Sequence, residues 1–378
     1  MTLNLLILIT LSVGLVVCVV YFIKHLVNLY KKRVVPDRFA LIRYENNPII
    51  QPKPYSGWET VGTFNPAAIK DDEGFVHLFY RAIGDDGISR IGHAKSMDGV
   101  NFPTKTPYPV YVFCTPPSYD ILKESGERDV VSGPKYYDTD IYSSGGSWGG
   151  CEDPRAIVMD GRVYMTYTAF EGWQSVRIAL TSISMEDLKA GKWNWKKPKF
   201  ISSITEVNKN WVLFPEKING KMAILHSVSP KVQISYVDDI NYIKSDEFIK
   251  SKAPSGGRED KWDNWMRGAG SPPVKTKLGW LLLYHAMDKK DPNKYKVGCM
   301  ILDLKDPSVI LYRSIYPILE PDAHYENDGK PGVVYASGAL VLDDDLYVYY
   351  GGGDKTVCVA KTPLKPLLAW LKKYGKTN

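Results

Sequence analysis

The segment Cys151-Glu-Asp-Pro-Arg-Ala-Ile-Val-Met-Asp-Gly-Arg-Val-Tyr-Met-Thr-Tyr-Thr168 joins a polar loop to two apolar runs. The first run, Ala156 to Met159, ends at the turn-forming pair Asp160-Gly161, and the second run carries β-branched and aromatic residues. Short runs of this composition on either side of an Asp-Gly turn are signals of a β-hairpin. The segment therefore predicts two antiparallel strands with a charged loop at the entrance to the first.

The same pattern occurs five times along the chain. The first strands are predicted to open at Phe64, Cys151, Phe214, Gly270 and Ala336, and the second strands at Phe75, Arg162, Lys221, Trp280 and Leu346. A third strand follows in each copy, from Arg90, Arg177, Val232, Lys296 and Thr356. Repetition at roughly 60-residue intervals predicts an all-β, five-bladed β-propeller over residues 41–378, with a β-sandwich as the alternative. A short C-terminal helix is expected from Pro366 to Tyr374.

The N-terminus carries a different signal. No charge occurs from Leu5 to Ile23, which is about the 20 residues that cross a bilayer. We expect a transmembrane anchor in residues 1–24 and a basic juxtamembrane linker in residues 25–40. All flanking bases follow the apolar run, so the positive-inside rule predicts a single-pass membrane protein with a cytoplasmic propeller. A cleaved signal peptide and the inverted topology are the alternatives.

Composition excludes several other classes of protein. The net charge is +6 over 378 residues, and only about +2 remains without the charges beside the apolar run. This balance predicts no nucleic-acid partner. The five cysteines are scattered, which favours a reducing compartment, and the chain shows no metal cluster or nucleotide-binding motif. Oligomeric state cannot be read from these features.

The first strands of a propeller surround one axis, so their leading loops should meet at a single mouth. These loops carry polar and charged residues far apart in the sequence: Asn65, Glu152, Asp153, Arg155, Glu216, Lys217 and Asp354. A glycosidic oxygen is a poor leaving group and needs a carboxylic acid to protonate it. We expect Glu152 to keep Asp153 protonated by like-charge repulsion.

Six segments, in order, resemble the motifs of glycoside hydrolase family 130. They are Phe64-Asn-Pro-Ala, Ser89-Arg-Ile-Gly, Cys151-Glu-Asp-Pro-Arg, Phe214-Pro-Glu-Lys-Ile-Asn-Gly-Lys, Gly268-Ala-Gly-Ser-Pro-Pro and Tyr284-His. The resemblance covers residues 47–363 and implies an inverting enzyme that cleaves β-mannosidic bonds. It implies that Asp153 is the general acid, acting through the 3-hydroxyl of the mannosyl ring, and that phosphate attacks the anomeric carbon to give α-mannose 1-phosphate.

The resemblance also implies roles for the other polar residues. Asn65, Glu152, Arg155 and Asp354 would bind the sugar, and Arg90, Arg177, Lys217 and His285 would bind phosphate, with Arg81 as a further candidate. Arginine suits phosphate because its donors form a fork, and lysine because it is a compact charge. Inorganic phosphate would be a co-substrate, and no cofactor is expected.

One motif departs from the family pattern. Where the phosphorylases commonly have Leu-His-Arg, this chain has Leu225-His226-Ser227. The missing cation leaves an inverting β-mannosidase as the alternative, because a hydrolase needs a carboxylate base instead of phosphate. A membrane-tethered, non-catalytic carbohydrate-binding propeller is the third possibility, although such a module has little use for a general acid beside cations.

Overall fold

A computed structural model describes residues 18–22, 24, 38–113, 146–171, 175–239, 248–251 and 255–377. The chain divides into two compact units, Met1–Arg38 and Phe39–Asn378. In the first unit the described residues 18–22 and 24 are helical, and most of the expected anchor lies outside the described residues. No helix among the described residues has the length and apolar character that a membrane span requires.

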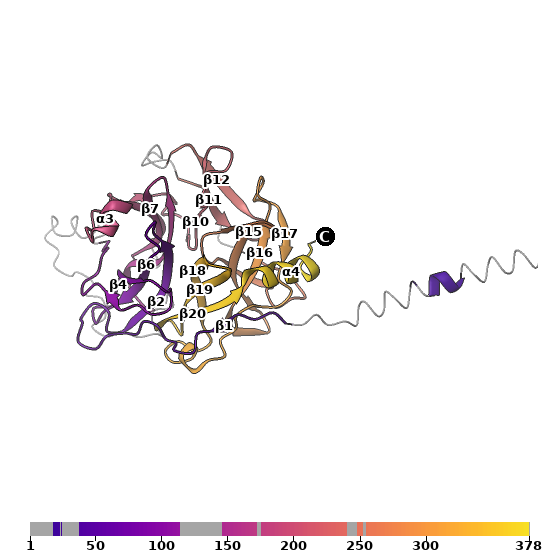
Figure 1. The fold of residues 1–378 in the computed structure, drawn as a ribbon, viewed down its shortest axis with the longest axis horizontal. Helices are drawn as coiled ribbons and strands as arrows, with labels where there is room; N and C mark the ends of the chain where they lie inside the picture. Colours follow the sequence, from indigo (N-terminus) through magenta and orange to yellow (C-terminus); the bar gives the residue numbers. More distant parts are fainter. Residues whose placement is uncertain are drawn as a thin grey trace, which may run out of the picture. The chain divides into compact units, whose positions relative to one another are not determined.

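The second unit is built almost entirely of antiparallel strands in five successive groups (Figure 1). Group 1 contains β2 (Gly62–Lys70), β3 (Val76–Ile83), β4 (Ile88–Ser96) and β5 (Thr104–Lys105). Group 2 contains β6 (Gly149–Met159), β7 (Arg162–Glu171), β8 (Val176–Ser184) and β9 (Lys199–Phe200). Group 3 contains β10 (Val212–Leu213), β11 (Met222–Ser227) and β12 (Gln233–Val237).

The last two groups complete the sheet structure. Group 4 contains β13 (Trp265–Ala269), β14 (Val274–Thr276), β15 (Gly279–Asp288), β16 (Asp291–Leu302) and β17 (Ile310–Arg313). Group 5 contains β18 (Val334–Leu342), β19 (Asp345–Gly352), β20 (Thr356–Pro363) and β1 (Ile42–Arg43). Short helices accompany them in the described part of the unit: α3 (Met185–Lys189), η2 (His324–Glu326) and α4 (Leu364–Tyr374).

The groups follow one another in a closed order. Strand β2 contacts β6, β6 contacts β10, β11 contacts β13, β16 contacts β18, and β18 returns to contact β2. Groups 1 and 2 also share a short parallel link, in which Ile88 and Ser89 pair with Gly149 and Gly150. The first strands of groups 1, 2 and 5 contact one another directly, β2 with β6, β6 with β18 and β18 with β2 (Figure 1).

The second and third strands lie where the sequence predicts them, but two first strands do not. Group 3 opens with Val212–Leu213, and group 4 opens with Trp265–Ala269, so both begin before the predicted Phe214 and Gly270. Pro215 and Pro272 follow these strands in the sequence, and proline cannot donate to a β-ladder. The Phe-Pro-Glu-Lys motif consequently marks the end of a first strand, whereas we expected its beginning.

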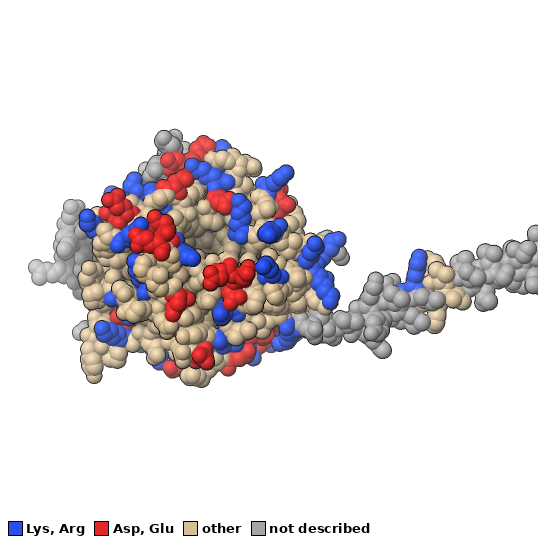
Figure 2. All heavy atoms as spheres, viewed as in Figure 1, with Lys and Arg blue, Asp and Glu red and all other residues tan. Residues whose placement is uncertain are grey.

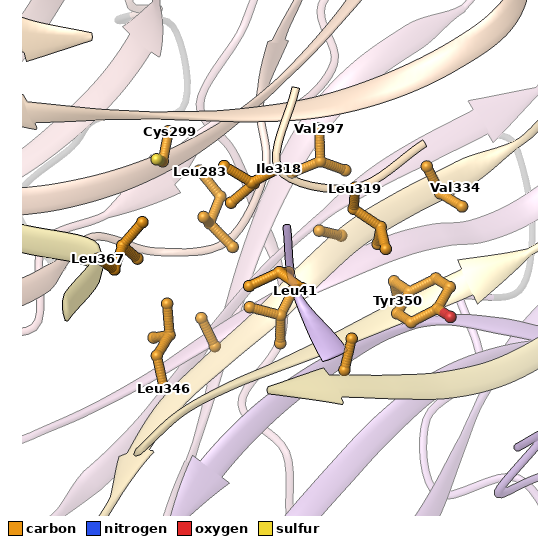
Figure 3. Packing of buried hydrophobic residues seen from close by; sticks show 14 of the residues in the cluster. Leu41, Leu283, Val297, Cys299, Ile318, Leu319, Val334, Leu346, Tyr350 and Leu367 are labelled. Carbon is orange, nitrogen blue, oxygen red and sulfur yellow. The ribbon is translucent and has the colours of Figure 1, made fainter. Parts of the chain in front are cut away.

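A large hydrophobic cluster joins groups 4 and 5 to the C-terminal helix (Figure 3). Leu283 and Val297 come from group 4, Leu346 from group 5 and Leu367 from α4. The predicted helix is confirmed, although it starts at Leu364, and Leu367 and Leu371 are fully buried. Helix α3 was not expected from the sequence.

Strand β1 closes the ring by adding an N-terminal strand to a C-terminal group. Ile42 pairs with Lys361 and Arg43 with Ala360. The Arg43 guanidinium donates to both carboxylate oxygens of Glu326, at 2.8 and 2.9 Å. Glu326 has no exposed surface and also accepts from the Tyr350 hydroxyl at 2.8 Å. The ion pair therefore fixes the position of β1 against group 5.

We expect Arg43→Ala to lower the free energy of unfolding by about 3 kcal/mol, because it leaves the buried Glu326 charge without a cation. The double variant Arg43→Ala/Glu326→Gln should regain much of this loss, since it removes the unpaired charge as well. Urea denaturation of the two single variants and the double variant measures the coupling. Strictly additive losses would show that the pair does not stabilise the closure.

Candidate active site

A backbone feature recurs in the first strands of neighbouring groups. Asn65, Asp153, Asn210 and Gly268 have positive φ angles of 48, 49, 65 and 126°. In groups 1, 2 and 4 the register with the second strand shifts at this point, between Phe64 and Ala67, Glu152 and Arg155, and Met266 and Gly268. A bulge re-aims the side chains next to it. The repeated bulge thus gathers residues from different groups.

Arg81, on β3, is the hub of the gathered residues. Its guanidinium donates to Glu152 Oε1 at 2.9 Å and to Asp153 Oδ1 at 3.1 Å. It also donates to Ser89 Oγ at 2.8 Å and Ser147 Oγ at 3.0 Å. Arg81 is only 1% exposed. A buried cation that contacts two adjacent carboxylates holds their charges together where repulsion would otherwise separate them.

Asp153 is held from two sides and is 6% exposed. Asn65 donates through Nδ2 to the same Oδ1 atom that Arg81 contacts, at 2.8 Å. A Cβ atom at Gly351 would lie 2.0 Å from Asn65 Oδ1, so only glycine leaves room for this amide. The geometry presents one carboxyl group in a defined orientation at the centre of the ring.

The charges around Asp153 determine its protonation. Burial alone would raise the pKa of Asp153, but the cations Arg81, Arg155 and Lys209 outweigh burial and lower this pKa to about 2. Glu152 does not act as the unpaired neighbour that we expected, because it binds Arg81 and accepts from Lys209 Nζ at 3.0 Å. The cations, rather than repulsion from Glu152, therefore dominate the pKa of Asp153, contrary to our expectation.

Arg155 connects this centre to groups 3 and 5. Its guanidinium donates to the Tyr335 hydroxyl at 2.8 Å, to Asn210 Oδ1 at 3.2 Å and to the carbonyl oxygen of Gly270 at 3.0 Å. The Tyr335 hydroxyl also donates to Asn210 Oδ1. Arg155 is 2% exposed. These bonds commit Arg155 to positioning its neighbours, and its charge still acts on Asp153.

Asp354 and His285 complete the cluster. Burial and the charge of Asp153 raise the pKa of Asp354, although Lys330 and Arg81 act in the opposite direction. His285 is fully buried and stacks on Tyr335 with ring centroids 4.2 Å apart. Burial lowers the pKa of His285 to about 3, so the imidazole is neutral at physiological pH. The charge of Asp153 and a backbone hydrogen bond with Ala336 act in the opposite direction on this pKa.

The structure does not bring all the predicted phosphate residues to this centre. Lys217 pairs with Asp160, at 3.3 Å, in the turn at the far end of β6. Asp160 follows Asp153 by seven positions of mostly extended chain, a span of roughly 20 Å. The expectation that Lys217 lies at the mouth is therefore wrong. It arose because we expected the first strand of group 3 to begin at Phe214, whereas this strand is Val212–Leu213 and Lys217 follows it.

The two predicted arginines lie on third strands, two strands away from the innermost one. Arg90 pairs with Asp86, through Nη1 at 2.9 Å and also through Nη2. The Arg177 guanidinium lies 3.6 Å from the centroid of the Phe200 ring. Each of these arginines thus contacts a residue of its own group, as arginines outside a binding site commonly do.

Sequence reasoning missed several residues of the centre, among them Lys209, Asn210, Arg267 and Tyr335. Two of them, Lys209 and Asn210, could have been recognised from the sequence. Lys209-Asn210 stands directly before the buried strand at Trp211, just as Glu152-Asp153 stands before the apolar run of group 2. Arg81 was only a secondary candidate for phosphate, yet an arginine inside the buried run of β3 requires a buried partner.

The sequence profile of glycoside hydrolase family 130, described as beta-1,4-mannooligosaccharide phosphorylase, matches residues 40–373. The chain belongs to this family. It is 37% identical over 338 residues to a 1,2-beta-oligomannan phosphorylase of a Thermoanaerobacter species, covering 86% of this chain and 98% of the relative. It is 35% identical, also over 338 residues, to a beta-1,2-mannobiose phosphorylase of the same organism, with coverages of 85% and 97%.

A solved structure of the family supports the fold. Beta-1,2-mannobiose phosphorylase from Listeria innocua, in complex with beta-1,2-mannobiose, matches with a TM-score of 0.65 and 25% identity. The match covers 88% of this chain and 99% of that chain. The protein thus has the mostly β-strand fold of family 130 structures.

The two central aspartates should affect acid stability with opposite signs. The pKa of Asp153 is lower in the folded protein than in the unfolded chain, so its ionised form stabilises the fold above about pH 4, by about 2 kcal/mol. This contribution disappears as the pH falls toward 2. The pKa of Asp354 is raised, so ionised Asp354 costs stability at neutral pH.

Urea denaturation between pH 7 and pH 3 tests this difference. Asp153→Asn should be less stable than wild type at pH 7, and the gap should narrow below pH 4. Asp354→Asn should be more stable than wild type at pH 7, and its advantage should vanish as the pH falls. Parallel pH profiles for the two variants would contradict the charge arrangement described above.

Proposed function

We propose that this protein is an inverting β-mannoside phosphorylase built on a five-bladed β-propeller, with Asp153 as general acid and phosphate as nucleophile. The observation that carries the proposal is the Asp153 carboxyl group, buried at the centre and surrounded by Arg81, Arg155 and Lys209. A carboxyl group serves the departing oxygen, and an excess of cations serves an attacking anion. The family membership supports the same reaction.

The charges around Asp153 explain how this residue acquires the proton that it donates. With a pKa of about 2, Asp153 carries no proton at neutral pH and cannot act as an acid. An anion bound beside Arg155 and Lys209 offsets those cations, which raises the affinity of Asp153 for a proton. Phosphate binding and protonation of Asp153 then reinforce each other. The same anion attacks the anomeric carbon while the glycosidic oxygen leaves with the proton.

The remaining residues divide into sugar and phosphate contacts. Asn65 and Asp354 lie beside Asp153 and can bind mannosyl hydroxyls. Lys209 lies where Lys217 was expected, with 24% of its side chain exposed, and is our candidate phosphate contact. His285 is fully buried beside Tyr335 and can donate one hydrogen bond in its neutral form. Glu152 and Arg155 position these groups.

A hydrolase is the second candidate and rests on two observations. Ser227 stands where the family's phosphorylases carry a cation, and Asp354 is a second carboxyl group near Asp153. Glu152 is a poor base because it is fully buried and bound to Arg81, Ser147 and Lys209. The cations that remain beside Asp153 favour phosphate, since a water nucleophile gains nothing from them.

The names of the relatives narrow the range of β-mannosides to propose as substrates. Both Thermoanaerobacter relatives are named for β-1,2-linked mannosides, at 37% and 35% identity. We therefore propose β-1,2-mannobiose or longer β-1,2-oligomannosides as substrates, and α-mannose 1-phosphate as the sugar phosphate product.

Incubating the protein with β-1,2-mannobiose, with and without phosphate, tests the reaction. We expect α-mannose 1-phosphate to form only when phosphate is present. Asp153→Asn should lower the turnover by about 10²–10⁴-fold, because its amide cannot donate an acidic proton. Phosphate-independent release of free mannose would instead favour the hydrolase, and the absence of any product would favour a binding module.

We also propose that residues 5–23 anchor the chain in a membrane, with residues 39–378 on the cytoplasmic side. The uncharged run and the bases that follow it support this topology. Full-length protein should remain in the membrane fraction after alkaline extraction, whereas Leu11→Lys/Val16→Lys should release it. Extraction of the unaltered chain, or its digestion by protease added outside intact cells, would contradict the proposal.

A further inference from the structure

The C-terminal helix α4 presents a basic face to solvent. Its other side is apolar, and Leu367 and Leu371 are fully buried in the cluster that joins groups 4 and 5. The exposed residues of the helix include four at relative positions 0, 4, 7 and 8, which share one helical face: Lys365, Ala369, Lys372 and Lys373. Residues 364–378 contain no Asp or Glu. The solvent side of α4 is therefore a stripe of positive charge.

The residues after the helix add a further cation in a fixed place. The Arg313 N–H donates to the Gly375 carbonyl oxygen at 2.6 Å, Lys376 forms a β-bridge with Tyr312, and Thr377 Oγ1 donates to a backbone oxygen of β17 at 2.7 Å. Lys376 is exposed. Figure 2 shows basic side chains at the edge of the molecule where Figure 1 places α4 and the C-terminus.

Helix electrostatics account for only part of this arrangement. Cations near the C-terminal end of a helix interact favourably with its dipole, which explains Lys372 and Lys373. Lys365 lies in the first turn, where the dipole disfavours a cation, and it pairs with the exposed Asp344 at 3.4 Å. Within the described part of the chain, neither Lys372 nor Lys376 forms an ion pair. Cations gathered without acids repel one another, and an anionic partner removes this cost.

The polypeptide enters this unit beside the same helix. Phe39 is the first residue of the second unit, and its ring centroid lies 5.7 Å from that of Trp370 on α4. Residues 24–38 separate Phe39 from the apolar run, contain five Lys or Arg residues and one acid, and span at most roughly 50 Å. A bilayer that holds the apolar run is therefore within reach of α4.

We propose that Lys365 and the C-terminal lysines (Lys372, Lys373 and Lys376) dock on the anionic lipid headgroups of the membrane surface. The inference rests on the proposed membrane anchor and names the surface of the second unit that faces the bilayer. A lysine close to an anionic bilayer raises the partition constant by about fivefold. The anchor makes docking intramolecular, with an effective concentration of about millimolar, so a weak attraction is sufficient.

Docking through α4 does not use the candidate active site. Helix α4 contacts β17 of group 4 and β20 of group 5, and neither strand supplies a residue to the centre around Asp153. The proposed docking therefore fixes the orientation of the second unit at the membrane and leaves the residues around Asp153 for the substrate.

Co-sedimentation of the full-length chain with lipid vesicles tests the assignment. Leu11→Lys/Val16→Lys, which prevents insertion of the apolar run, is the common background. This protein should bind vesicles of equal parts phosphatidylcholine and phosphatidylglycerol, bind phosphatidylcholine vesicles far more weakly, and be released by added salt. In this background, replacing the three C-terminal lysines by Gln should lower the partition constant by about 10–100-fold.

Lys192→Gln/Lys196→Gln/Lys197→Gln provides the matched control. It removes the same charge from three exposed lysines that follow α3, and α3 and α4 lie on opposite sides of the view in Figure 1. The control should bind vesicles as the background protein does. Replacing the C-terminal lysines by Arg keeps the charge and should retain binding. Exposed lysines contribute little to stability, so all variants should unfold at the same temperature.

Equal vesicle binding by the Gln variant of the C-terminal lysines and by the control would overturn the assignment. Two further measurements cover other partners of a basic surface. Tighter binding of a short DNA duplex than of vesicles, dependent on the C-terminal lysines, would assign the surface to nucleic acid. Self-association in sedimentation velocity with the same dependence would assign it to a second copy of the chain.

Alkaline extraction of the unaltered chain separates failure of the anchor from failure of the docking surface. If the chain is extracted, but the C-terminal lysines still govern vesicle binding, the anchor is wrong and the docking surface stands. If the chain stays in the membrane, but the C-terminal lysines have no effect on vesicle binding, only the docking surface is wrong.

Discussion

The contact of the Arg81 guanidinium with two adjacent carboxylates is the interaction on which the centre depends. Glu152 and Asp153 are neighbours in the sequence, and both are buried. Two such charges would repel each other strongly in an environment of low polarity. Arg81 bonds to one oxygen of each, and Lys209 takes the remaining oxygen of Glu152. Only with these cations in place can Asp153 be held with its other oxygen available.

The same charges impose a condition on catalysis. They favour ionised Asp153, whereas a general acid must carry a proton. An attacking anion resolves this conflict, because it neutralises the cations at the moment when the acid is needed. The excess of positive charge is therefore a reason to expect an anionic nucleophile. Figure 2 shows acidic and basic side chains interspersed over one face of the molecule, without a large area of one sign among the described residues drawn there.

The repeated bulge explains why the site combines residues from every part of the chain. Groups 1, 2, 4 and 5 each have a register shift in the first strand, beside Asn65 in group 1 for example, and group 3 supplies Asn210, which has a positive φ angle. Hydrogen bonds then cross between groups, from Asn65 to Asp153 and from Arg155 to Tyr335. These positions differ in residue type although their backbones are alike. The repeated strands therefore set the positions of the side chains, and the differences in residue type at these positions supply the chemical groups of the site.

Much of the protein could be read from its sequence. The periodic strands and the C-terminal helix depend on local pattern, and the second and third strands lie where that pattern predicts. Asp153 was expected in a charged loop, but it lies inside β6, where the register shifts between Glu152 and Arg155. The choice of cations could not be read in this way. Lys217 and Lys209 are eight positions apart in one segment, and which of them meets Asp153 depends on where β10 ends.

The protonation of Asp153 was also beyond the sequence. The adjacency of Glu152 and Asp153 suggested repulsion and a retained proton, but Arg81 on β3 and Lys209 just before β10 reverse the sign of the local field. The sequence by itself determined the repeated strands and the carboxyl group at their centre, because hydrophobic alternation and turn residues act locally. Only the tertiary structure decided which charges surround that carboxyl group, because they converge through bulges in strands far apart along the chain.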